Sequence, residues 1–380
     1  MNVLLVNLDH GSKTRSTHVP VALGLLKLGA YYRQEKHTVK MASCQYLNKT
    51  FTPDIICFSP LFFFNLKADL GFILSYRKMF PKALIRIGGM TVTFKRDVYT
   101  KHLGTKNVEL VEGLQPEFDG VLPAYDLLGM TVSYGFTSRG CTRKCEWCVV
   151  PKTEGKMQKV GHWKNSIHPD HKLYLAMDNN FLACGYDWVE DVITEFVNRK
   201  MKVDFNQGLD CRIFASDGRF VELFHRHKEV FYALRFSWDS KAQDKYVVKT
   251  LEMLKKTKVK GSSNTLWYML YGAHDNPEEI WNRIRVLTSY GNRIKPMCFR
   301  NLETGGYESG WVEKFRQYIY GVSGSTNYIT ERNFRDGVYG HTPDGFLKVL
   351  EIGKKTKNMS RNFLKNGLPS LINEGENARA

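Results

Sequence analysis

The sequence predicts an α/β protein in which a doubly wound N-terminal domain precedes a partial or full barrel of parallel strands. Two observations support this fold class. Short apolar runs alternate with stretches of helical length and pattern along most of the chain. The first run, NVLLVNLD, is nearly continuous in its apolar character, which is typical of a parallel strand buried on both faces.

The N-terminal α/β domain is expected over residues 1–115. Its predicted strands cover 2–9, 38–42, 54–59, 83–87 and 108–111, and its predicted helices cover 20–32 and 65–79. Pro20 suits the start of the first helix, because its missing N–H would be unpaired there anyway. Residues 116–130, which contain two prolines and two glycines, are predicted to form a connector.

A second alternating series is expected over residues 131–305. Its predicted strands cover 131–137, 172–177, 202–207, 231–237, 265–271 and 295–299. The helices between them are predicted at 187–199, 217–226, 242–256 and 277–289. Repeated βα units of this kind favour a barrel, complete or partial. Residues 306–380 are predicted to be a basic C-terminal extension.

Composition and charge indicate the kind of partner that the protein binds and whether it enters a membrane. The chain has 380 residues and a formal net charge of +17, which favours an anionic partner, with nucleic acid as the first candidate. The longest apolar stretch, residues 55–64, is too short to span a bilayer. The N-terminus lacks a cationic lead and a cleavage site. We therefore expect a cytoplasmic protein that does not enter a membrane.

Three of the eight cysteines form a compact motif. Cys141, Cys145 and Cys148 stand at CxxxCxxC spacing in the loop after the first predicted barrel strand. Thiolates are soft ligands that suit zinc or iron–sulfur clusters. Three ligands from one loop leave one iron of a cluster open, whereas structural zinc requires a fourth ligand. Cys184 or Cys211 would supply that ligand in the zinc alternative.

The run GCTRKCEWCVVP resembles the cluster loops of the radical SAM superfamily, in which an aromatic or bulky residue precedes the third cysteine. Trp147 has that place here. The resemblance implies a 4Fe-4S cluster held by the three cysteines, S-adenosylmethionine (SAM) on the fourth iron, and an external electron donor similar to flavodoxin or ferredoxin. The loop is also similar to those of tRNA methylthiotransferases and of the cobalamin-binding radical SAM group.

The same resemblance implies that SAM is contacted by residues that follow the later barrel strands. In addition to Trp147 beside the cluster, these predicted cofactor-binding residues are Asp178, Asn180, Arg212, Ser237 and Gly272. Asp178 and Asn180 would accept from the methionine ammonium group. Arg212 would pair with the methionine carboxylate or with a substrate phosphate. Ser237 and Gly272 would lie near the adenosyl portion.

The N-terminal third resembles the cobalamin-binding-like domain that precedes some radical SAM barrels. Histidine-ligated cobalamin proteins of that kind carry Asp-x-His-x-x-Gly in the first loop, and Asp9-His10-Gly11 does not fit this pattern. Whether cobalamin binds is therefore left open. Only Cys44 and Cys57 precede the triad, so the second cluster of a methylthiotransferase is not expected.

The sequence thus predicts a radical SAM enzyme that cleaves SAM reductively and acts by hydrogen abstraction or radical methyl transfer. A nucleic acid or nucleotide is the first candidate for its substrate, because of the basic charge. The alternative is a non-enzymatic nucleic-acid-binding protein stabilised by zinc or by a cluster.

Overall fold

The computed structural model describes residues 1–8, 23–43, 51–257, 259, 265–273, 275–301, 311–312, 315 and 329. Several sequence predictions lie outside these residues, namely those for Asp9–Gly11, Pro20, Cys44 and almost all of the C-terminal extension. The chain divides into two compact units. The first contains residues 1–180 and 195–204, and the second contains residues 181–194 and 205–380. No helix in the described ranges is both long and apolar enough to cross a membrane.

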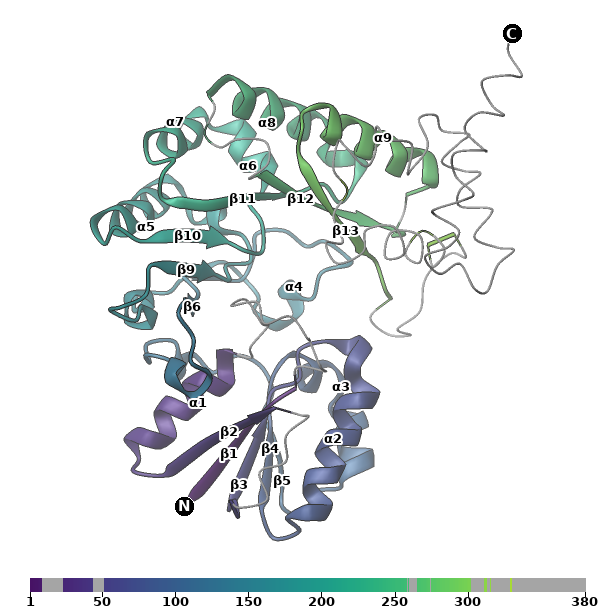
Figure 1. Cartoon of the computed structure of the whole chain (residues 1–380). Helices are drawn as coiled ribbons and strands as arrows, with labels where there is room; N and C mark the ends of the chain where they lie inside the picture. Colours follow the sequence, from purple (N-terminus) through teal and green to yellow (C-terminus); the bar gives the residue numbers. More distant parts are fainter. Residues whose placement is uncertain are drawn as a thin grey trace, which may run out of the picture. The chain divides into compact units, whose positions relative to one another are not determined.

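A five-stranded parallel sheet forms the N-terminal part of the first unit (Figure 1). Its strands are β1 (Asn2–Asn7), β2 (Thr38–Ser43), β3 (Ile55–Phe58), β4 (Leu84–Ile87) and β5 (Val108–Leu110). They lie in the order β2-β1-β3-β4-β5, and every pairing between neighbours is parallel. This strand order is that of flavodoxin-like doubly wound sheets. The predicted α/β class with parallel strands is confirmed.

Alternation along β1 explains why helices cover both faces of this sheet. Val3 and Leu5 pack in a cluster with residues of α1 (Leu23–Gln34). Leu4 and Val6 point to the other face and pack with residues of α2 (Leu66–Met79) and α3 (Met90–Leu103). Figure 1 shows these helices on opposite sides of the strands. A strand buried on both faces requires the continuous apolar run seen in the sequence.

The connector at residues 116–130 contains two short 3₁₀ turns, Pro116–Phe118 and Tyr125–Leu128. Tyr125 is 2% exposed. Its hydroxyl accepts from the backbone N–H of Tyr134 at 2.8 Å and lies 2.7 Å from the carbonyl of Ser166, to which it donates. Tyr134 belongs to β6 (Ser133–Gly135), so this phenol fixes the connector to the first strand of the second sheet.

The second sheet has six strands in the order β13-β12-β11-β10-β9-β6. After β6 they are β9 (Leu173–Ala176), β10 (Lys202–Phe205), β11 (Phe231–Ser237), β12 (Thr265–Tyr271) and β13 (Arg293–Cys298). Each strand is hydrogen-bonded to the one that precedes it in this series, as repeated βα units predict.

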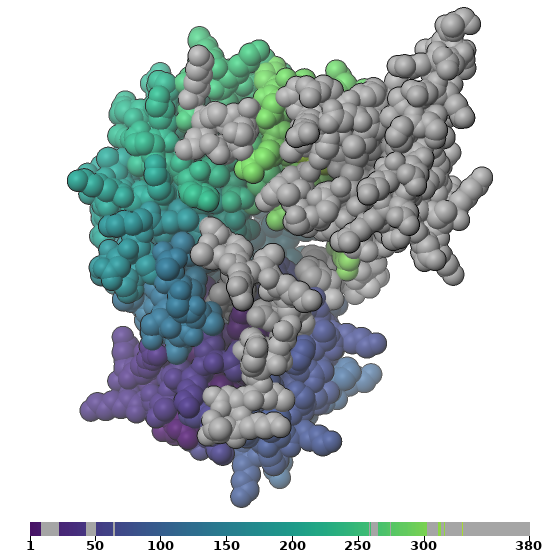
Figure 2. Space-filling view, viewed as in Figure 1, coloured from purple at the N-terminus to yellow at the C-terminus, as the bar shows by residue number. Residues whose placement is uncertain are grey.

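The helices of this second series also agree with the sequence prediction. They are α5 (Tyr186–Asn198), α7 (Gly218–Arg226), α8 (Asp244–Thr257) and α9 (Pro277–Ser289). Figure 2 shows the atoms of this second series in teal and green in a space-filling view. Two short helices were not predicted: α4 (Val150–Thr153) and α6 (Cys211–Ser216).

The buried Tyr125 phenol provides a test of the connector. Tyr125→Phe removes the hydroxyl and leaves the N–H of Tyr134 and the carbonyl of Ser166 without this partner. We expect the free energy of unfolding to fall by about 1–3 kcal/mol, measured by urea denaturation. Tyr232→Phe is the matched control, because the side chain of Tyr232 is 50% exposed. Equal stability of the two variants would contradict this assignment.

Candidate cysteine-loop site

The three cysteines lie in a loop that is closed at its base by two short antiparallel strands. β7 (Ser138–Arg139) pairs with β8 (Gln158–Lys159), so residues 140–157 form an excursion between them. Just inside the base, the N–H of Cys141 donates to the carbonyl of Gly155 at 3.3 Å. Trp147 and the three cysteines are half-buried within this loop. The sequence prediction placed them in one loop but did not predict its base.

Gly140 is required for the chain to enter the loop. Its φ is +75°, a conformation that residues with a Cβ rarely adopt. A Cβ built here would lie 2.2 Å from the carbonyl oxygen of Lys156, which is backbone and cannot rotate away. The residue directly before Cys141 therefore has to be glycine for both reasons.

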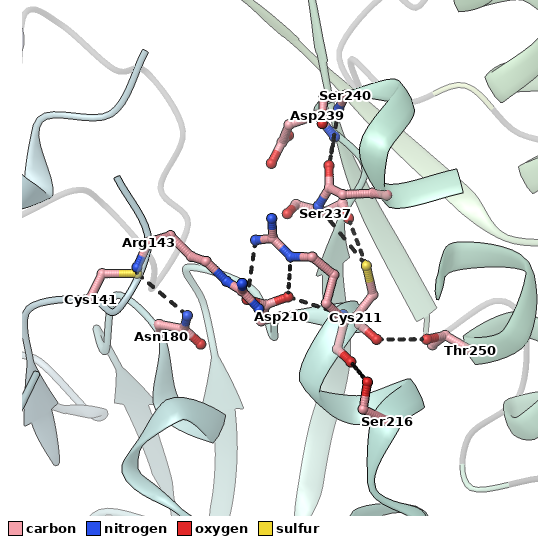
Figure 3. Close-up of polar contacts among 12 residues, drawn as sticks. Cys141, Arg143, Asn180, Asp210, Cys211, Ser216, Ser237, Asp239, Ser240 and Thr250 are labelled. Atoms are coloured by element: carbon pink, nitrogen blue, oxygen red, sulfur yellow. Dashed lines mark hydrogen bonds and ion pairs between the residues drawn. The ribbon is translucent and has the colours of Figure 1, made fainter. Parts of the chain in front are cut away.

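Two N–H groups converge on the sulfur of Cys141. The backbone N–H of Arg143 donates to Sγ at 3.3 Å, and Nδ2 of Asn180 donates to it at 3.4 Å (Figure 3). Hydrogen bonds of this kind adjust the properties of metal-bound sulfur. The structure thus brings together two residues that the sequence assigned to one site, Cys141 and Asn180.

The remaining cysteines follow in a tight turn. The N–H of Cys148 donates to the carbonyl of Cys145 at 3.0 Å, and none of the three cysteines forms a disulfide with another described residue. Within the described ranges, no group of three or more His, Cys, Asp or Glu side chains is gathered closely enough to hold a metal ion. The donor set fits a cluster by its chemistry, since it offers three soft ligands and N–H donors to sulfur. Binding would require the three sulfur atoms to turn toward a common centre.

Asp178 anchors the segment that leads into the loop. It is 3% exposed, and its carboxylate accepts from Thr137 Oγ1 and Ser138 Oγ at 2.6 Å each and from Thr137 N at 3.1 Å. Burial raises the pKa of Asp178, and the hydrogen bonds from Ser138 and Thr137 oppose this effect. The carboxylate of Asp178 therefore has hydrogen-bond donors within the protein. Two of them are the side chains of Ser138, at the start of β7, and of Thr137, just before it.

Glu154 holds both the entry of the loop and the turn after β9. Its carboxylate accepts from the N–H of Gly140 at 3.0 Å, from Nδ2 of Asn179 at 2.5 Å and from the guanidinium of Arg139 at 3.2 Å. Asn179 is the neighbour of Asn180, whose amide reaches Cys141. One carboxylate therefore fixes the backbone before Cys141 and the segment that donates to its sulfur.

A chain of alternating charges connects Glu154 with the N-terminal sheet domain. Lys27 on α1 lies 2.8 Å from Asp119, Asp119 lies 2.9 Å from Arg139, and Arg139 continues to Glu154. The four side chains are between 6% and 16% exposed. Burial alone would raise the pKa of Asp119, but the charges and hydrogen bonds of Arg139 and Lys27 outweigh it, so this pKa lies below its ordinary value.

The other predicted SAM-binding residues belong to the second unit. Arg212 is bound through Nε and Nη2 to its own neighbour Asp210, at 2.8 and 3.1 Å (Figure 3). Asp210 also caps α6, because it accepts from the N–H of Arg212 at 3.0 Å. Ser237 ends β11, and its carbonyl accepts from Gln243 Nε2 at 3.4 Å and from the Cys211 thiol at 3.7 Å.

Gly272 follows β12 with a φ of +84°. The space next to it is taken by Val312, because a Cβ on Gly272 would lie 2.6 Å from a methyl group of Val312. The N–H of Gly272 donates to Asp275 Oδ1 at 2.6 Å. The structure therefore supplies a packing reason for this glycine, whereas its predicted place beside the adenosyl group stays a prediction.

Four residues of the cysteine-loop site were missed by the sequence analysis. They are Lys27, Asp119, Arg139 and Glu154. Arg139 and Glu154 flank the cysteine motif. Opposite charges on the two sides of a loop could have been used to predict this ion pair. Lys27 and Asp119 carry no such signal, because they are distant from the motif in sequence.

Comparisons of the whole chain with family models and with curated proteins gave no match. The cysteine-loop site is therefore interpreted from its own geometry and from the pattern of its residues.

The strained entry of the loop can be tested by substitution. Gly140→Ala should lower the free energy of unfolding by about 1–3 kcal/mol, because it combines an unfavourable φ with a backbone clash. Gly161→Ala is the matched control, since a Cβ at Gly161 meets nothing within 4 Å. Chemical denaturation of both variants measures the difference. If Gly140→Ala were no less stable than Gly161→Ala, this account of the loop entry would be wrong.

Proposed function

We propose that this protein is a radical SAM enzyme whose cysteine loop holds a 4Fe-4S cluster through Cys141, Cys145 and Cys148. The observation that carries the proposal is the CxxxCxxC loop itself, with its base closed by β7 and β8 and with two N–H donors on the sulfur of Cys141. Three thiols from one loop leave one iron of a cluster without a protein ligand. The six-stranded sheet with sequential strand order supports the partial barrel that this class requires.

The bound cluster would supply an electron for reductive cleavage of SAM, which gives a 5′-deoxyadenosyl radical or a methyl-transfer equivalent. The residues of this chain prepare the loop for that role. Gly140 allows the sharp entry, Glu154 fixes it, and Asn180 donates to a ligand sulfur. Half-burial of the loop limits access of water, which protects reactive intermediates from side reactions.

Among the proposed contacts to SAM, Asn180 is supported by its hydrogen bond to the sulfur of Cys141. The other predicted contacts to SAM stay predictions, namely those of Asp178, Trp147, Arg212, Ser237 and Gly272. Binding of cobalamin and of a flavodoxin- or ferredoxin-like electron donor also stays a prediction. For Arg212, SAM would have to share the guanidinium with Asp210, to which it is already bound. The substrate is proposed to be anionic, on the net charge of +17.

The decisive experiment is anaerobic reconstitution of the full chain with iron and sulfide, followed by dithionite and SAM. We expect about four iron atoms per chain, and release of 5′-deoxyadenosine or S-adenosylhomocysteine measured by liquid chromatography. 5′-Deoxyadenosine indicates hydrogen abstraction, and S-adenosylhomocysteine indicates methyl transfer. Cys145→Ala should abolish both products, because two thiolates do not hold the cluster. Zinc-loaded protein without either product would overturn the proposal.

Cys184→Ala serves as the matched control in the same assay. A cluster with three protein ligands does not use Cys184, so product release should match the unsubstituted chain. A tetrahedral zinc site that borrowed Cys184 as its fourth ligand would instead lose metal in this variant. Metal content per chain therefore distinguishes the two kinds of site, even where product formation is slow.

A further inference from the structure

Two histidines outside the cysteine-loop site lie against each other in the first unit. His168 and His171 belong to the segment between the 3₁₀ turn Trp163–Ser166 and β9. Their rings are stacked, with centroids 4.5 Å apart and planes at 28°. His171 is 7% exposed, whereas the side chain of His168 is 35% exposed. Neither ring takes part in the cysteine-loop site, so this pair requires a separate explanation.

Both ring nitrogens of His171 are hydrogen-bonded to other parts of the chain. Nε2 lies 2.9 Å from the carbonyl oxygen of Met130 in the connector, and Nδ1 lies 3.0 Å from the hydroxyl of Ser133 on β6. A carbonyl can only accept, so Nε2 carries the proton and Nδ1 accepts from the Ser133 hydroxyl. The Ser133 oxygen itself accepts from the backbone N–H of His168 at 2.9 Å. These hydrogen bonds are all made while His171 is neutral.

A proton on Nδ1 of His171 would disturb this arrangement. Nδ1 would become a donor, and the Ser133 hydroxyl would have to turn its hydrogen away from the ring. Ser133 is 0% exposed, so water does not replace the lost partner. The imidazolium would also be a charge in a buried place. Protonation of His171 is therefore coupled to loss of its contacts with the connector and with β6.

The groups next to His171 in the same segment act on its charge in both directions. Burial lowers the pKa of His171 most, and the positive charge of a protonated His168 lowers it further. The hydrogen bond to the Met130 carbonyl and the charge of Asp170 oppose this effect. The Asp170 side chain is 90% exposed, so solvent screens its charge. The pKa of His171 therefore lies below that of an ordinary histidine.

The neighbouring part of the connector and β6 carry two phenols and one carboxylate. The ring of Tyr125 lies 5.1 Å from that of His171. Burial raises the pKa of Tyr125 and of Tyr134, so both phenols stay neutral at the pH values at which histidine titrates. Asp126 is paired with Arg33 at 2.8 Å, which balances its charge. These groups therefore do not compensate a positive charge on His171.

We propose that His171 is an acid-sensitive latch between the connector and β6. While its ring is neutral, it joins the carbonyl of Met130 to the hydroxyl of Ser133, beside the ring of Tyr125. When both stacked histidines take up protons, their like charges repel each other and these contacts are released. β6 leads into the segment that carries the cysteine loop, so the latch sets the pH range in which the connector holds that strand.

The direction of the pH dependence follows from proton linkage. The pKa of His171 is lower in the folded chain than in the unfolded chain, so unfolding takes up a proton at acid pH. The stabilisation that depends on neutral His171 is complete above about pH 6.5, near the ordinary pKa of histidine, and is lost as the pH falls below this value. The latch uses none of the cysteines, so its test requires no iron, sulfide or SAM and does not depend on the proposed function.

The test compares urea unfolding of the full chain and of His171→Gln at pH 7.5 and at pH 5.5. Glutamine keeps an N–H for the Met130 carbonyl but does not titrate. Over this interval, the equilibrium constant of unfolding should rise at least about threefold more in the unsubstituted chain than in His171→Gln. His102→Gln is the matched control and should follow the unsubstituted chain, because His102 is an exposed histidine of α3 in the same unit.

Amide hydrogen exchange provides a second measurement, which does not require a variant that folds. The backbone N–H of His168 donates to Ser133, and that of Tyr134 donates to the Tyr125 hydroxyl. After correction for the intrinsic exchange rate, the protection of these two amides should fall at least about threefold between pH 7.5 and pH 5.5 in the unsubstituted chain. The amides of β3, a buried strand of the same unit, should lose less protection.

Two results would overturn the proposal. One is an equal pH dependence of unfolding in the unsubstituted chain and in His171→Gln. The other is a loss of amide protection at His168 and Tyr134 that is no larger than the loss in β3. That second result would indicate that acid acts on the whole unit and not on the contact between the connector and β6.

Discussion

The conformation of the cysteine loop depends on the carboxylate of Glu154. This group accepts from the backbone before Cys141, from the side chain of Asn179 and from Arg139, and it is 10% exposed. A buried carboxylate is stable only while its donors remain. Two of the donors lie at the entry of the loop and the third lies in the turn after β9, whereas Glu154 itself lies near the exit of the loop, so the requirement to satisfy one charge holds these segments together.

Much of the fold could be predicted from the sequence, because strands buried on both faces must be apolar throughout. β1 and β3 are of this kind, and β11 and β12 coincide with their predicted limits. The helix α3 was not predicted. It contains Thr91, Val92 and Thr93, β-branched residues with low helix propensity, and it is stabilised by packing of Val92 and Tyr99 against the sheet. Tertiary contacts of this kind are not visible in a local pattern.

The candidate site was predicted in part. Spacing alone placed the three cysteines in one loop, and the resemblance to radical SAM barrels selected Asn180, whose amide donates to the sulfur of Cys141. The donors to Asp178 were not predicted, because residue type does not reveal which acid meets which donor. Arg212 was predicted to bind SAM or a substrate phosphate, yet its guanidinium is bound to the neighbouring Asp210. Whether a polar side chain faces a ligand or the protein depends on rotamers that the sequence does not encode simply.

The salt bridge from Lys27 to Asp119 links the N-terminal α/β domain to the segment that leads into the cysteine loop. Lys27 belongs to the first helix, whereas Arg139 lies two residues before Cys141. Removing residues 1–115 would keep every cysteine of the loop but would strip Asp119 of one of its two cations and uncover the hydrophobic neighbours of α1. The doubly wound sheet is thus structurally tied to the segment that carries the cysteine loop, so a chain without residues 1–115 would have an altered loop environment.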